Sequence, residues 1–125
     1  MLVPILKQGE YIIASIQSEL SDADLLKLRD DLVRRVSEFS SRGVIVDVTV
    51  LDVMDSFATR TLRSMAHMIM LRGAETVIVG IQPEVAFSMV QLGLKLEGVK
   101  TALDLEEGLT LLDNRIKKGD KKLGK

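Results

Sequence analysis

Several residue types on which catalytic or metal sites depend are scarce in this chain of 125 residues. Cysteine is absent, which excludes disulfide bonds, thiol nucleophiles and zinc–thiolate or iron–sulfur sites and fits a reducing compartment. A single histidine, His67, leaves no pair of histidine or cysteine ligands for a metal. Aromatic residues make up only 3% of the chain, so aliphatic side chains must fill the core. Because no apolar run approaches the about 20 residues that cross a bilayer, and Met1-Leu2-Val3-Pro4 lacks the basic start of a signal peptide, we expect a cytoplasmic location.

Charge is unevenly distributed although the net charge is only −1. Residues 115–125 carry six basic side chains and one acidic side chain, whereas residues 1–114 carry 11 basic and 17 acidic side chains. The acidic body argues against a nucleic-acid groove. We expect one domain over residues 1–114, and a basic C-terminal end over residues 115–125 that continues a helix and then frays.

Hydrophobic periodicity predicts strands that alternate with helices. Strands are expected at 4–7, 11–16, 44–49 and 76–81 and near 100–102, and helices after Ser21 or Asp22, at Ser56, at Pro83 and at Asp104. This order predicts an α/β domain with a single mixed, mostly parallel sheet and about four helices.

Three- and four-residue spacing also predicts which side of each helix faces the core. The expected inward residues are Leu25, Leu28, Leu32, Val36 and Phe39, then Ala58, Leu62, Met65 and Ile69, then Val85, Met89 and Leu92, and finally Leu105, Leu109, Leu112 and Ile116.

Few residues remain that could support catalysis. Neither a Walker motif nor a G-x-G-x-x-G loop occurs, and His67 has no serine or acid in a triad pattern. Asp47, Asp52 and Asp55 fall at or beyond the end of one strand, where three carboxylates can hold Mg²⁺ and one can accept a phosphoryl group, as in a receiver domain. The acidic pair that a receiver needs after its first strand is incomplete here, and local capping of turns is the other interpretation.

Ser56 stands where a loop gives way to a helix, at the N-cap or in the first turn. A hydroxyl there is aimed by the backbone, and the helix dipole tolerates added negative charge. A simple capping role is the alternative to a covalent switch. Met54, Asp55 and Phe57 flank Ser56, and exposed apolar groups around a polar centre are typical of a docking patch, so these three are the candidate docking residues.

The chain resembles the STAS domain family, which takes its name from sulfate transporters and anti-sigma-factor antagonists. The resemblance spans nearly the whole chain and is strongest to the small single-domain scaffold subunits of the bacterial stressosome. It is carried by Pro4-Ile5-Leu6-Lys7, Ser15-Ile16-Gln17, Asp55-Ser56-Phe57, Gly80-Ile81-Gln82-Pro83 and the segment from Thr101 to Leu109.

The resemblance implies a non-enzymatic regulator without a cofactor, in which Ser56 is the phosphorylation site. Such subunits assemble with RsbR-type sensory paralogues, hold a serine/threonine kinase of the RsbT type until phosphorylation releases it, and are reset by an RsbX-type phosphatase. Phe57-Ala58 departs from the Ser-Gly pair of many free antagonists but agrees with the stressosome subgroup. A free anti-anti-sigma factor and a receiver-like phosphoacceptor using Asp52 or Asp47 with Mg²⁺ stay open as alternatives, and Thr59 and Thr61 lie near the site.

Overall fold

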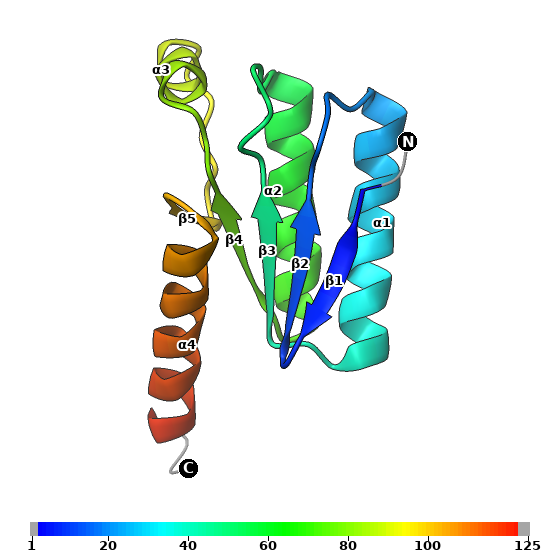
Figure 1. Ribbon diagram of the computed structural model, residues 1–125, viewed down its shortest axis with the longest axis vertical. Coiled ribbons are helices and arrows are strands. Elements are labelled where there is room, and N and C mark those ends of the chain that lie inside the picture. Colours follow the sequence, from blue (N-terminus) through cyan, green and yellow to red (C-terminus); the bar gives the residue numbers. More distant parts are fainter. Residues whose placement is uncertain (1–2, 123–125) are drawn as a thin grey trace.

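A computed structural model describes residues 3–122 of the chain, and the side chains of residues 3–120. In chain order the elements are β1 (Ile5–Gln8), β2 (Tyr11–Ser15), α1 (Asp22–Phe39), β3 (Gly43–Asp47), α2 (Ser56–Leu71), β4 (Glu75–Val79), α3 (Pro83–Gln91), β5 (Lys100–Ala102) and α4 (Leu105–Lys122) (Figure 1). The predicted order of strands and helices is confirmed. Of the expected basic end, residues 115–122 belong to α4, and residues 123–125 lie outside the described residues.

The five strands form one sheet in the order β1-β2-β3-β4-β5. The β1–β2 hairpin is antiparallel, and β2, β3, β4 and β5 are parallel to one another, which confirms the mixed, mostly parallel sheet. Because these four strands run the same way, their carboxyl ends meet at one edge of the sheet. The loops that carry functional residues in such folds gather at that edge.

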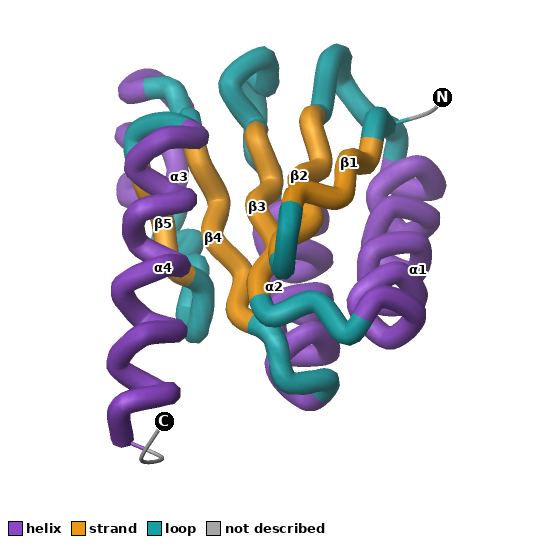
Figure 2. The backbone as a smooth tube through the Cα atoms, turned by 60° about the horizontal axis from the view of Figure 1, so that its bottom comes forward, coloured by secondary structure: helices purple, strands orange, loops and turns teal. Residues whose placement is uncertain are grey.

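Helices cover both faces of the sheet (Figure 2). α1 and α2 pack on one face, where Ile12, Val44, Val46 and Ile78 point from the strands into the larger core cluster. α4 packs on the other face, where Leu112 contacts a smaller cluster formed by Ile13, Ile45, Val77 and Val79. The central strands are therefore apolar on both sides, as parallel strands covered by helices are.

The predicted inward faces are confirmed except near helix ends. Phe39 is 42% exposed because Ser40 turns the chain into the left-handed region at φ 50°, so the buried stripe of α1 stops at Val36. Leu92 is 70% exposed because α3 ends at Gln91 and Leu92 is its C-cap. Of the four residues expected to face inward from α4, Leu112 is fully buried, Leu109 and Ile116 are half-buried, and Leu105 is exposed.

Two strands end earlier than the sequence pattern predicts. β3 was expected to reach residue 49 but stops at Asp47, whose Oδ1 accepts hydrogen bonds from the Thr49 N–H at 2.9 Å and the Thr49 hydroxyl at 2.6 Å. β4 was expected to reach residue 81 but stops at Val79, because Gly80 takes a positive φ of 82°. An apolar run does not reveal such turns, since its hydrophobicity continues past them.

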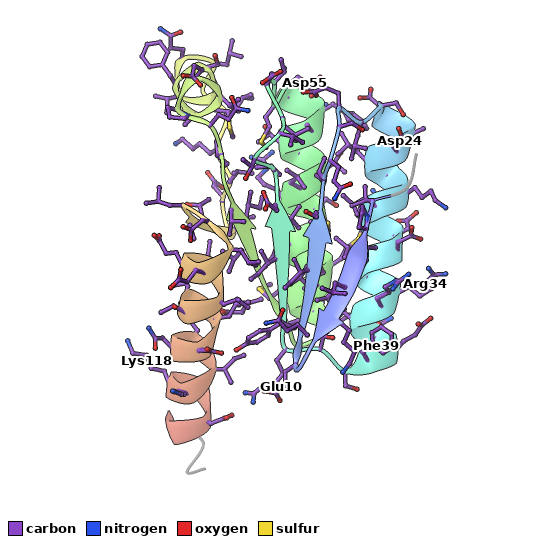
Figure 3. The ribbon with its side chains drawn as sticks, viewed as in Figure 1. Glu10, Asp24, Arg34, Phe39, Asp55 and Lys118 are labelled. Carbon is purple, nitrogen blue, oxygen red and sulfur yellow. The ribbon has the colours of Figure 1, made fainter. Side chains whose placement is uncertain are left out.

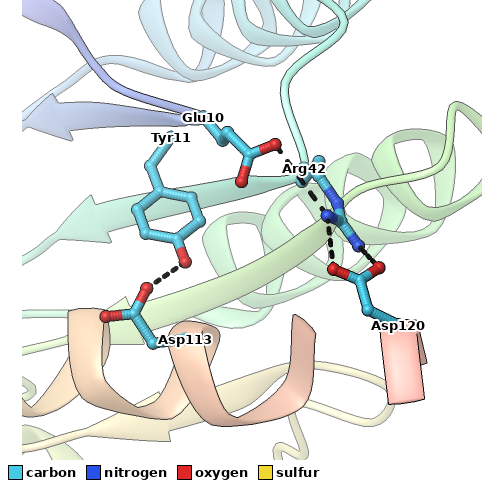
Figure 4. Close-up of polar contacts among 5 residues, drawn as sticks. All are labelled: Glu10, Tyr11, Arg42, Asp113 and Asp120. Carbon is cyan, nitrogen blue, oxygen red and sulfur yellow. Dashed lines mark hydrogen bonds and ion pairs between the residues drawn. The ribbon is translucent and has the colours of Figure 1, made fainter. Parts of the chain in front are cut away.

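Polar side chains attach α4 to the amino ends of the parallel strands (Figure 4). Arg42, just before β3, contacts Asp120 at 2.8 Å and Glu10 at 3.8 Å. The Tyr11 hydroxyl donates to Asp113, and burial together with that hydrogen bond raises the pKa of Tyr11 well above its usual range. Similarly, Arg115 pairs with Glu75 at the start of β4. α4 is thereby oriented by contacts at one end of the sheet, opposite the edge where the strands end.

α1 begins with a reciprocal capping box. The Ser21 hydroxyl accepts from the Asp24 N–H at 3.1 Å, and the Asp24 carboxylate accepts from the Ser21 N–H at 3.2 Å. Hydrogen bonding to the Ser21 backbone lowers the pKa of Asp24 below its usual value. The box fixes the loop between β2 and α1, which borders the site described below.

We expect Gly108→Ala to destabilise the protein by about 1–3 kcal/mol. A Cβ at residue 108 would lie 2.8 Å from Val79 Cγ1, so α4 would have to move away from the sheet. Gly119→Ala on the same helix is the matched control, since a Cβ there meets nothing within 4 Å. It should stabilise α4 by up to about 1 kcal/mol. Urea unfolding of both variants measures the difference, and equal behaviour would contradict the close approach at Gly108.

The capping box should make stability depend on pH through Asp24. Because the folded state lowers the pKa of Asp24, its contribution is present above the carboxylate's ordinary pKa and is lost as the pH falls through the lowered value. Wild type should therefore exceed Asp24→Asn in unfolding free energy at neutral pH, and the difference should shrink in acid. NMR titration of the Asp24 carboxyl carbon checks the cause. A carboxyl that titrates at its ordinary value in the folded protein would refute it.

Candidate functional site: the loop before α2

Ser56 is the first residue of α2, and its neighbour Asp55 is the N-cap. Asp55 Oδ1 accepts the Ala58 N–H at 2.8 Å, so the capping role belongs to Asp55. Ser56 is exposed, and among the described residues none forms a hydrogen bond with its hydroxyl. Figure 3 places Asp55 at the end of α2 that lies beside the carboxyl ends of the strands. The expected position of Ser56 at the helix start is confirmed.

The loop between β3 and α2 is anchored by every third residue. Val48, Leu51 and Met54 are buried in the larger core cluster. Met54 is only 4% exposed, so it cannot belong to the docking patch in which we expected it. Between these anchors, Val50 and Val53 face solvent, and Val53 is 63% exposed. The repeat of apolar residues at 48, 51 and 54 is the sequence signal that could have distinguished the anchors from the exposed valines.

The other residues named near the site divide by exposure. Asp55 is exposed and Phe57 is half-buried, so both remain available for docking. Thr59 and Thr61 are buried, and their hydroxyls donate to the backbone oxygens of Asp55 at 2.9 Å and Phe57 at 2.8 Å. Of the three hydroxyl residues in the first two turns of α2, only Ser56 is accessible to another protein.

The aspartates near the site each make a separate local contact. The carboxylate of Asp47 binds Thr49, that of Asp55 caps α2, and that of Asp52 accepts from Gln82 Nε2 at 3.3 Å. Within residues 3–122, no group of three His, Cys, Asp or Glu side chains is placed to hold a metal ion. The sequential strand order with an antiparallel edge also differs from the 2-1-3-4-5 order of receiver domains. The receiver-like alternative with Mg²⁺ is not supported.

A small cavity of about 80 Å³ opens beside the loop. It lies between the β2–α1 segment and the β3–α2 loop and is lined by Ile16, Glu19, Leu20, Leu25, Val53 and Asp55, among others. Ligand pockets for metabolites are typically about 300–1,000 Å³. This cavity therefore has room for about one side chain of a partner.

His67 is exposed on α2. No helix in the described part of the chain is long and apolar enough to span a membrane.

Comparison with known proteins gives a consistent result. A family model described as the STAS domain matches residues 3–108. A serine-to-glutamate variant of RsbS from Moorella thermoacetica is 34% identical, with a TM-score of 0.79 over 92% of this chain and 97% of that chain. A chain in a structure of the stressosome, described as a signal integration and transduction hub, is also 34% identical, with a TM-score of 0.73 over 90% and 98%.

Curated relatives match over a shorter part of their length. The RsbT co-antagonist protein RsbRA of Bacillus subtilis (strain 168) is 29% identical over 83 residues, which is 66% of this chain and 30% of RsbRA. RsbRD of the same organism is 27% identical over 88 residues, 32% of its length, so this chain spans about a third of these relatives. The anti-sigma factor antagonist SpoIIAA is 15% identical with a TM-score of 0.71, which shows a shared fold. The matched segment, the sheet and the helices agree with one another, and the chain belongs to the STAS domain family, in which it is similar to RsbS of Moorella thermoacetica and to a chain of the stressosome.

Proposed function

We propose that this protein is a non-enzymatic scaffold and regulator of a stressosome. In this function it sequesters a serine/threonine kinase of the RsbT type and releases it when Ser56 is phosphorylated. The observation that carries the proposal is the exposed Ser56 hydroxyl at the start of α2, which Asp55 leaves unused by taking the capping role. Similarity to RsbS over nearly the full length of both chains supports the scaffold role more strongly than the fold-level likeness to SpoIIAA supports a free antagonist.

Phosphorylation of Ser56 should change the surface more than the fold. The modification adds about −1.5 to −2 charges and three acceptor oxygens at neutral pH. The dipole of α2 favours this charge by about 0.3–1 kcal/mol, and the nearby carboxylates of Asp52 and Asp55 oppose it. These two effects nearly offset each other, so α2 should stay folded.

A bound partner should respond more strongly to the modification. Ser56 lies close in sequence to the exposed Val50 and Val53 and next to the half-buried Phe57, a partly apolar surface that a partner could cover. Covering a dianion with such a surface removes water from its oxygens at a cost of several kcal/mol, and each 1.4 kcal/mol is about tenfold in affinity. Release of the kinase therefore follows from desolvation and repulsion, without refolding of this domain.

The proposed partners follow from the relatives. RsbRA and RsbRD are named co-antagonists of RsbT and share sequence with this chain over 66% and 70% of its length. We therefore place the chain in a large cytoplasmic hetero-oligomer with RsbR-type sensory paralogues. An RsbX-type phosphatase would remove the phosphate from Ser56 and restore kinase binding.

Incubation with an RsbT-type kinase, ATP and Mg²⁺ should place one phosphoryl group on Ser56. The γ-phosphoryl of ATP moves to Ser56 Oγ, ADP leaves and the hydroxyl proton is released. Mass spectrometry maps the site, and Ser56→Ala should remain unmodified. Stability of the label in acid marks a serine phosphate, whereas an acyl phosphate on aspartate hydrolyses. Label on Thr59, Thr61 or an aspartate with Ser56 untouched would overturn the assignment.

Negative charge at Ser56 should weaken capture of the kinase by about tenfold or more. We expect the unmodified protein and Ser56→Ala to bind equally, and Ser56→Asp and the phosphorylated protein to bind more weakly, in that order. Isothermal calorimetry or surface plasmon resonance measures the four affinities. Ser37→Asp is the matched control, because Ser37 is exposed near the opposite end of the molecule, in the last turns of α1. Equal affinity of Ser56→Asp and Ser56→Ala would defeat the release mechanism.

A further inference from the structure

Gln82 belongs to the motif Gly80-Ile81-Gln82-Pro83, and the proposed function gives it no role. It is the N-cap residue of α3, yet its side chain makes no capping hydrogen bond there. Its amide nitrogen Nε2 instead donates to the Thr49 backbone oxygen at 2.8 Å and to Asp52 Oδ1 at 3.3 Å. Both acceptors lie in the β3–α2 loop, which leads directly to Ser56. A side chain at the start of α3 therefore holds this loop.

A second side chain holds the same loop from the opposite side. Glu19, in the segment between β2 and α1, accepts the Asp52 backbone N–H on its Oε1 at 2.9 Å. Asp52 is thus tied through its backbone to Glu19 and through its carboxylate to Gln82. Hydrogen bonds to a carboxylate are stronger than those between neutral groups. These contacts of Glu19 and Gln82 with Asp52, which we call the clamp, fix the loop four residues before Ser56.

Gly80 allows Gln82 to come this close. A Cβ at residue 80 would lie 2.1 Å from Thr49 Oγ1 and 3.2 Å from Asp47 Oδ1. Gly80 also has a positive φ of 82°, which side chains disfavour. Both properties bring the segment before α3 directly against Thr49, so that the glutamine amide reaches two acceptors at once.

α3 packs against the rest of the domain through few buried side chains. Only Val85 and Met89 of this helix are buried, whereas Phe87 and Val90 are exposed. Figure 1 shows α3 beyond the carboxyl end of β4, apart from the helices that cover the sheet. An element with few buried contacts shifts at low cost. The contact between Gln82 and the loop therefore joins the segment before Ser56 to a helix with few buried side chains.

We propose that Gln82 is a positioning residue that fixes the β3–α2 loop, which leads to Ser56, to the start of α3, with Glu19 holding the other side of the loop. The presentation of Ser56 to a kinase then depends on where α3 lies, and a partner that displaces α3 loosens the phosphoacceptor loop. The kinase part of this inference rests on the proposed function. Its structural part, the order of the loop, does not.

Gln82→Glu tests the clamp, because a carboxylate has no N–H to donate and faces the Asp52 carboxylate and the Thr49 oxygen. Hydrogen exchange of the Leu51 and Asp52 amides, which bind Val48 O and Glu19, should become about tenfold faster, as expected for losing a hydrogen bond. Gln91→Glu makes the same change on the exposed end of α3 and should leave exchange unchanged. Should Gln82→Glu fail to fold, Gln82→Met removes the donors without adding charge and should give the same direction.

A second substitution separates the clamp from general destabilisation. Combining Asp52→Asn with Gln82→Glu places a donor at position 52 and an acceptor at position 82, which reverses the original pair. The double variant should recover several-fold of the lost protection, since the new amide at position 52 can donate to the new carboxylate at position 82 while the Thr49 contact stays broken. Exchange as fast as in the single variant, or unchanged exchange in Gln82→Glu, overturns the inference.

Kinase assays distinguish this inference from the proposed function. Gln82→Glu should raise the KM for phosphorylation of Ser56 by about tenfold and leave kcat near that of wild type, because the loop must be ordered on binding. A wild-type protein that the kinase does not phosphorylate on Ser56 refutes the proposed function, while the exchange result still decides the clamp. An equal KM for both proteins, with normal phosphorylation of wild type, refutes the link from Gln82 to Ser56.

Discussion

The hydrogen bond from the Ala58 N–H to Asp55 decides what Ser56 is free to do. A helix start leaves backbone N–H groups without partners, and the residue that caps them directs its side chain back at the chain. Asp55 meets this need, so the next residue can direct its hydroxyl outward. Leu51 and Met54 of the β3–α2 loop are buried in the core and hold the loop against it. Ser56 is therefore accessible because Asp55 caps α2 and because Leu51 and Met54 hold the preceding loop in place.

The parallel sheet separates two kinds of contact. At the amino ends of its strands, Arg42 and Arg115 join α4 to the body through ion pairs. At the carboxyl ends, loops from three different strands meet around Asp52. The first set orients a helix that covers the sheet, and the second set shapes a surface that another protein can approach. A change at one end need not disturb the other, because the apolar strands between them form a closely packed block.

Strong periodic signals made the fold and the position of Ser56 predictable from sequence. Strands apolar on both sides and helices with regular apolar stripes gave the element order, and the Asp-Ser pair placed the helix start. Phe39 and Leu92 were predicted to face the core but are exposed, because each lies at a helix end and periodicity does not show where a helix ends. Met54 was misjudged because a loop can bury side chains. The contacts of Glu19 and Gln82 with Asp52 could not be predicted, since they join residues about 30 positions apart through loop geometry.

Distance between the two ends of the sheet has a practical consequence. Lys118 is exposed on α4, far along the molecule from Asp55 and the start of α2 (Figure 3). Because these 125 residues contain no cysteine, replacing Lys118 by cysteine would provide a single thiol among them for a fluorophore or a surface tether. When the protein is immobilised through this thiol, the end of the molecule that carries Ser56 would face the solution, and every copy would have the same orientation.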